Sequence, residues 1–146
     1  MSFLPPSTNA AYRGSRLSAW FLTLAALFTL GPGLIHSVLP DGGAHSIAGL
    51  DLGDRAGVVI GVFRWEGATQ IAFGLALLIV SLRYRSLTPL FLALVLLQAA
   101  LVAVQGWVLS PPANGHHPPA HYGSLAAIVL SAVFLALSLP LRTGPS

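Results

Sequence analysis

The sequence predicts an all-α membrane protein, a bundle of four transmembrane helices with both termini in the cytoplasm. Hydrophobic residues make up 55% of its 146 residues and charged residues only 8%, whereas soluble proteins carry about 25% charged residues. Four stretches reach the roughly 20 apolar residues that a bilayer span requires. They cover about residues 17–39, 63–82, 87–109 and 121–141, which leaves room for a single domain over 1–146.

The charged residues predict the orientation of these spans. Five of the seven basic residues flank their inner ends, namely Arg13, Arg16, Arg83, Arg85 and Arg142. The acids and histidines lie toward the other end: Asp41, Asp51, Asp54, Glu66, His36, His45, His116, His117 and His121. Short cytoplasmic loops carry an excess of arginine, and the arginine segments share one side only if the chain crosses four times. We expect a bacterial inner-membrane location with both termini inside.

The first span follows a short N-terminal segment. Residues 1–14, with Pro5 and Pro6, indicate a flexible cytoplasmic tail. The apolar run from Leu17 is longer than the hydrophobic region of a cleaved signal peptide, so we expect a retained span. Residues 31–33, Gly-Pro-Gly, lie in its outer third and predict a kink or break, because proline removes a backbone donor.

Two loops face outward in this topology. Residues 40–62 open with a Pro-Asp-Gly-Gly turn, and their amphipathic stretch 50–55 is expected to lie along the interface or to extend the second span. Residues 110–120 contain too many prolines to be helical. Small residues on the middle spans predict close helix packing; they include Gly67, Ala68, Gly74 and Ala76, then Ala99, Ala100, Ala103 and Gly106.

Charged residues occur where the second span begins, at Arg64-Trp65-Glu66, about 17 residues or roughly 26 Å of helix from Arg83. Arg64 and Glu66 point in different directions on a helix, whereas Glu66 and Gln70 share a face. Charges inside a membrane are costly and usually face the bundle interior. Three interpretations of these residues are open. They form an interfacial anchor, a ligand or proton site, or an ion pair between helices.

The third span carries two glutamines, Gln98 and Gln105, which lie seven residues apart and so on one helix face. Glutamines in spans form hydrogen bonds between helices or line a pocket. Trp107 and Trp20 are expected at the outer and inner membrane interfaces, where aromatic residues are enriched.

Polar residues of different spans are expected at a similar outward depth: His36, Glu66, Gln70, Gln105 and His121. In a compact bundle they form an outward-opening pocket over a floor of leucine and alanine, the usual form of a small-molecule site. Arg64, Gln98 and Tyr122 complete the candidate pocket residues. This convergence depends on helix rotation, and it predicts that Glu66 lies in the bundle interior near His36 or His121.

The densest polar cluster is the His-His-Pro-Pro-Ala-His run over 116–121. Imidazole is a common ligand of zinc, copper and iron, so His116, His117 and His121 are candidate metal ligands; the alternative is a solvated loop. The two prolines argue against a helical pairing of His117 with His121. A haem held by His36 and His121 is conceivable, but no motif requires a metal, a haem or any other cofactor.

Several chemistries and partners are excluded. The chain has no cysteine, which excludes disulfides and thiolate metal sites. It has no nucleophile elbow, no phosphate-binding loop with a lysine and no paired catalytic carboxylates. Its net charge of +3 comes from arginines that flank spans and does not form a nucleic-acid groove. The expected partners are the lipid bilayer, other membrane proteins or further copies of the chain.

The second span also carries the residues of a family resemblance. Arg64-Trp65-Glu66-Gly67 opens this span and Phe73-Gly74-Leu75 follows. With the length, the four spans and the cytoplasmic termini, the chain resembles the DoxX-like group of small bacterial four-helix membrane proteins. The resemblance implies a membrane protein that is sometimes a subunit or partner of redox systems, and it assigns no functional residue.

Three functions remain open. The first is a binding or accessory membrane protein with an outward-facing polar pocket, alone or as a subunit of a larger assembly. The second is a membrane redox or metal-dependent enzyme subunit that uses the outer histidines. The third is a small proton-coupled transporter with Glu66 as its titrating carboxylate. We favour the first, because the chain is small and lacks catalytic motifs, although this does not decide whether it is an enzyme.

Overall fold

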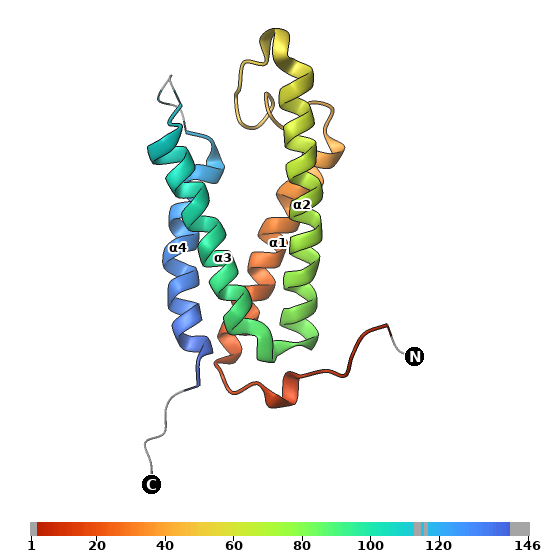
Figure 1. Ribbon diagram of the computed structural model, residues 1–146, viewed down its shortest axis with the longest axis vertical. Coiled ribbons are helices and arrows are strands. Elements are labelled where there is room, and N and C mark those ends of the chain that lie inside the picture. The colour runs from red at the N-terminus through yellow and green to blue at the C-terminus, as the bar shows by residue number, and fades with distance from the viewer. Residues whose placement is uncertain (1–2, 113–114, 116, 141–146) are drawn as a thin grey trace.

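The computed structural model describes residues 3–112, 115 and 117–140, and that part of the chain contains helices and no strand (Figure 1). Four long helices run alternately up and down: α1 (Arg16–Val38), α2 (Ala56–Arg83), α3 (Thr88–Val104) and α4 (Pro119–Ser138). With the short turns that extend α2 and α3, each is long and apolar enough to cross a membrane. By length and composition, the chain is an integral membrane protein built on four helices, as predicted.

Short turns extend or connect these helices. Three 3-10 turns cover Asn9–Ala11, Gly53–Arg55 and Arg85–Leu87, and a π-helical turn, Gln105–Leu109, continues α3. The second helix begins at Ala56, earlier than predicted, so the stretch after residue 50 extends the second span outward. The fourth helix ends at Ser138, before the predicted 141, because a residue that precedes proline, here Leu139, disfavours the helical conformation.

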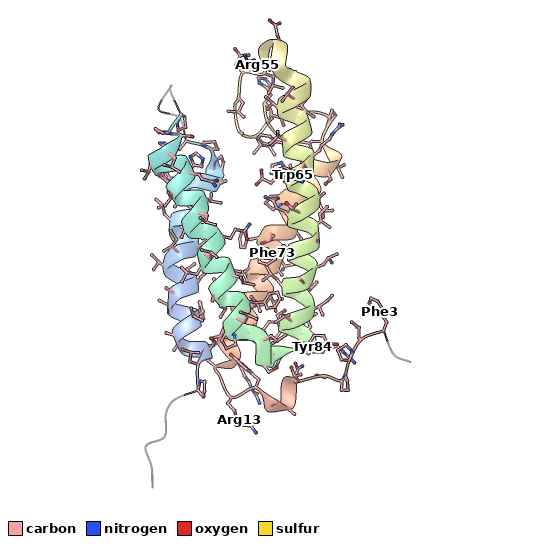
Figure 2. The ribbon with its side chains drawn as sticks, in the orientation of Figure 1. Phe3, Arg13, Arg55, Trp65, Phe73 and Tyr84 are labelled. Carbon is pink, nitrogen blue, oxygen red and sulfur yellow. The ribbon has the colours of Figure 1, made fainter. Side chains whose placement is uncertain are left out.

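The charged residues divide between the two ends of the bundle. Arg16, Arg83 and Arg85 lie at one end, which we call the arginine end; the opposite end is the histidine end, with His36 and His121. Figure 2 shows Arg13 and Tyr84 at the arginine end and Arg55 at the other. The asymmetry predicted from the sequence is therefore present in the described residues, while Arg142 lies outside them.

The Gly-Pro-Gly sequence at 31–33 does not break the first helix, so the break that was one of the two expectations is absent; the other expectation, a kink, stays a prediction. Helix α1 continues through Pro32 to Val38. Gly33 is buried against α2, where an added Cβ would lie 3.1 Å from the Gly67 carbonyl oxygen, and its own carbonyl accepts a hydrogen bond from Ser37 Oγ at 2.8 Å. Gly33 therefore serves close helix packing instead of a helix break.

The four helices form two pairs. Helix α1 packs most extensively against α2, and α3 against α4, with much less contact between the pairs. The pairs meet at the arginine end, where buried side chains of α1, α2 and α3 form the core: Leu22, Ala26, Leu77, Val80 and Leu92. Figure 1 shows the pairs close together at this end and apart toward the histidine end.

Specific contacts between α1 and α4 hold the pairs together at the arginine end. The rings of Phe21 and Phe134 stack with centroids 4.4 Å apart. Ser18 Oγ donates to the Phe134 carbonyl at 2.9 Å, and the backbone N–H of Ser15 donates to the Leu137 carbonyl at 3.0 Å. Because these contacts occupy only this end, the bundle is closed there and opens toward the histidine end.

The N-terminal segment is bound to the bundle at residues 5–9, where the sequence predicts a flexible tail. Asn9 Nδ2 donates to the Leu82 carbonyl at 2.7 Å, and the N–H of Thr8 donates to the Arg83 carbonyl at 3.0 Å. In return, the Tyr84 hydroxyl donates to the Pro5 carbonyl at 2.9 Å. These bonds form because backbone carbonyls at the end of α2 have no partner within the helix and accept them instead.

Candidate functional site

At the histidine end, His36 is held by the loop that follows α1. Its Nδ1 lies 2.6 Å from the Gly42 carbonyl oxygen, and its ring meets the Phe63 ring edge to face, with centroids 5.1 Å apart. A carbonyl oxygen only accepts hydrogen bonds, so Nδ1 carries the hydrogen and a neutral His36 has its lone pair on Nε2. His36 is thus fixed in place by α1, this loop and α2.

The loop itself is organised by the carboxylate of Asp41. Its oxygens accept from the backbone N–H groups of Gly43, His45 and Ser46, at 2.9, 3.1 and 2.7 Å, and from the Ser46 hydroxyl at 3.1 Å. These bonds, that from the Ser46 N–H first, lower the pKa of Asp41 to about 2, from 3.8. Asp41 therefore shapes the loop whose Gly42 carbonyl holds His36.

This network predicts a loop that depends on pH and on Asp41. The pKa of Asp41 is lowered in the folded protein, so its contribution is complete above about pH 3.8 and is lost as the pH falls toward 2. We expect Asp41→Asn to speed hydrogen exchange at the His45 and Ser46 amides several-fold at neutral pH, because an amide offers one acceptor oxygen instead of two.

The matched control for this prediction is Asp51→Asn, because Asp51 accepts one hydrogen bond within the same loop, from the Gly53 N–H at 3.2 Å. Exchange at the His45 and Ser46 amides should match wild type in this control. Equal exchange in Asp41→Asn and wild type would contradict the assigned role of the carboxylate.

Glu66 and Gln70 share one face of α2, as predicted. Gln70 Nε2 donates to Glu66 Oε1 at 2.9 Å. Among the described residues, the buried Gln70 Oε1 has no hydrogen-bond partner, and buried polar oxygens usually accept at least one hydrogen bond. Arg64 donates from Nη2 to the Pro40 carbonyl at 3.4 Å, and in the described part of the chain it forms no ion pair.

The helical spacing of α2 shows which way Glu66 faces. Leu77 and Val80 are buried in the core, and Phe73 packs against it (Figure 2). At intervals of three and four residues toward the histidine end, this face continues through Gln70 to Glu66. Glu66 therefore lies on the same face of α2 as the core residues. It is exposed because it lies nearer the histidine end than the packed core does. Glu66 is thus exposed and not buried in the bundle, while its expected nearness to His36 or His121 stays a prediction.

Helix α3 presents its glutamines to the same side. Phe91 and Val95 pack against the core, and Gln98 and Gln105 continue that face toward the histidine end at the same spacing. Both glutamines are exposed. Two large apolar side chains of α3, Leu97 and Val104, are also exposed, and each immediately precedes a glutamine and so lies about 100° around the helix from it. The glutamines therefore continue the face of α3 that packs against the core, whereas Leu97 and Val104 are turned away from it.

The second pair carries its own aromatic cluster. His117 Nδ1 lies 2.9 Å from His121 Nδ1, and the His117 ring stacks on Trp107 with centroids 3.8 Å apart. Trp107 Nε1 donates to the His121 carbonyl at 3.2 Å, and Tyr122 meets the Trp107 ring edge to face at 5.4 Å. His117 precedes α4, which begins at Pro119, and its ring still meets that of His121.

A π-helical turn and a glycine make room for this cluster. Gly106 lies in the turn Gln105–Leu109, and a Cβ placed on it would come within 2.6 Å of three atoms of the His121 ring. The imidazole thus lies flat against the backbone of α3. Single π-helical turns occur frequently at functional sites because they reorient the side chains that follow.

Of the three predicted metal ligands, the structure brings His117 and His121 together, and the third, His116, lies outside the described residues. Among the described residues, no three histidine or acidic side chains are grouped to hold a metal ion. His36 belongs to the α1–α2 pair and His121 to the α3–α4 pair, and each ring has its own local partners. A metal on His117 and His121 would have to displace the hydrogen that their nitrogens share.

The candidate pocket residues therefore fall into two groups. His36, Arg64, Glu66 and Gln70 lie on the first pair, and Gln98, Gln105, His121 and Tyr122 lie on the second. The π-helical turn, the role of Gly106 and the stacking of Trp107 are absent from the sequence predictions. Only the unusual Gln-Gly-Trp composition at 105–107 gives any hint of them.

The fold and these two groups define the class of protein: an integral membrane protein of four helices in two pairs that diverge at the histidine end. No protein family, no curated protein and no solved structure matches this chain.

Proposed function

We propose that this chain is a binding or accessory protein of a bacterial inner membrane, with both termini in the cytoplasm and the histidine end outside. Between its two helix pairs it holds a small molecule with polar groups. The supporting observation is that Glu66 on α2 and Gln98 and Gln105 on α3 are all exposed on the faces that meet in the core. An exposed carboxylate or amide in a span is costly in lipid, so these groups require water or a ligand.

The chemistry of this space selects the ligand class. Glu66 and the glutamines offer hydrogen-bond acceptors and donors, and the buried Gln70 Oε1 lacks a donor. Apolar side chains such as Phe73 form the floor below them. This combination suits an amphiphile that has a hydrogen-bonding head and an apolar body, because polar groups fix orientation while apolar walls supply most of the buried area.

Single cysteines test the proposed space, since the chain contains no cysteine of its own. In intact cells, a membrane-impermeant maleimide should label Gln98→Cys and Gln105→Cys, because a thiol reacts only where water allows it to ionise. The controls Leu97→Cys and Val104→Cys immediately precede the two glutamines, lie about 100° around the same helix and are exposed, and we expect them to face lipid and stay unlabelled. Equal labelling of the glutamine positions and the controls would contradict a water-accessible space between the helix pairs. Labelling of the glutamine positions only in broken cells would mean that the histidine end faces the cytoplasm.

Analysis of the purified protein distinguishes the proposed binding role from a redox role. Mass spectrometry of the extracted protein should find a retained organic molecule that Gln105→Leu loses and Val104→Ala keeps. Stoichiometric metal or a haem absorption band that His117→Ala removes would instead favour the redox subunit.

A further inference from the structure

The arginine end carries a second site, which is independent of the proposed function. An open cavity of about 550 Å³ lies between the N-terminal segment, the start of α1 and the turn after α2. Its polar and aromatic lining residues are Asn9, Tyr12, Arg13, Arg16, Trp20 and Arg85. A volume of this size is within the range of pockets that hold small molecules.

The cavity concentrates positive charge with no acid to balance it. Three arginines line it, and every acidic residue of the chain lies between positions 41 and 66, at the histidine end. Arg13 donates from Nη1 to the Ala10 carbonyl at 2.8 Å, and Arg85 from Nε to the Ser81 carbonyl at 3.0 Å. These bonds direct the guanidinium groups and leave most of their N–H donors available, since each group carries five.

The position of the cavity indicates where its ligand comes from. Arg16 is the first residue of α1 and Arg85 lies in the turn between α2 and α3, so both sit at the end of a spanning segment. Trp20, one helical turn farther in, is 62% exposed, as aromatic residues are where hydrocarbon meets the headgroups. This is the depth at which phospholipid phosphates lie.

We propose that this cavity binds the phosphate of an anionic phospholipid headgroup through Arg13, Arg16 and Arg85. The planar guanidinium fork matches the geometry of phosphate oxygens. Tyr12 closes one wall, where its hydroxyl donates to the Ser15 carbonyl at 3.0 Å and burial raises the pKa of its phenol, so the wall stays uncharged. A zwitterionic headgroup fits less well, because its ammonium group would face three arginines.

Native mass spectrometry of the full chain in detergent tests this site. Short-chain phosphatidylglycerol should bind well above phosphatidylcholine of the same chain length, and Arg16→Gln or the Arg13→Gln/Arg16→Gln pair should weaken binding roughly tenfold per arginine. Arg83→Gln is the matched control, because Arg83 lies at the same end but outside the cavity and donates to the Pro5 carbonyl at 3.1 Å. Arg16→Lys should retain more affinity than Arg16→Gln.

Three outcomes would overturn the proposal. If Arg83→Gln weakened lipid binding as much as Arg16→Gln, the lipid would be attracted by the general positive charge of the arginine end and not bound at a specific site. Competition by inorganic phosphate at the same concentration as the lipid would show that the source is a soluble anion. Equal binding of the two lipids would remove the headgroup selectivity. None of these outcomes bears on the maleimide test at the histidine end, so the two proposals fail separately.

Discussion

Gly67→Ala is expected to lower the free energy of unfolding by about 1–3 kcal/mol, the usual cost of added volume in a packed site. A Cβ at Gly67 would lie 2.8 Å from His36 Cβ, 2.9 Å from the Gly33 carbonyl oxygen and 2.9 Å from Ser37 Oγ. Two of these three atoms cannot rotate away, so α1 and α2 must separate. Reversible unfolding in mixed detergent measures the change.

The matched control is Gly61→Ala, which lies on α2 less than two turns away and has no atom within 4 Å of an added Cβ. Alanine favours helix over glycine by roughly 0.5–1 kcal/mol, so this variant should be neutral or more stable. The two substitutions make the same chemical change on the same helix, but their expected effects on the free energy of unfolding have opposite signs. A loss of stability in both variants would contradict close packing at Gly67 as the cause.

The predicted fold follows largely from composition, because a bilayer restricts the chain to a few solutions. Apolar runs of sufficient length separated by arginines or prolines leave little besides four antiparallel helices. The boundaries that failed depend on finer effects. The second helix starts at Ala56 because the apolar residues before Phe63 continue its pattern, and α1 passes through Pro32 because Gly33 packs against Gly67.

The candidate site was only partly predictable, because helix rotation and pairing are tertiary properties. The Glu66–Gln70 bond follows from their spacing on one helix. Whether His36 and His121 converge depends on how the pairs diverge, and spacing along the chain carries no information about that. The stacking of His117 on Trp107 involves a π-helical turn that no sequence pattern predicts, and the two prolines were an argument only against a helical pairing of His117 with His121.

That turn leads to the second large effect. Gly106→Ala should destabilise the α3–α4 pair by about 1–3 kcal/mol, because the new methyl group would occupy the position of the His121 ring, whose Nε2 lies 2.5 Å from the added Cβ. Displacing the ring also breaks its hydrogen bond with His117. The control Gly123→Ala has no atom within 4 Å of its Cβ and should leave stability unchanged or raised.

A double-mutant cycle separates this steric cause from a general weakening of the π-helical turn. If the His121 ring is the obstacle, Gly106→Ala should cost little in a His121→Ala background, because the ring that it displaces is already absent. The two changes would then be strongly non-additive, as expected for residues in direct contact. Additive losses of stability would mean that the backbone of α3 itself requires glycine at position 106. The contact of the His121 ring with Gly106 would then not be the reason for glycine at this position.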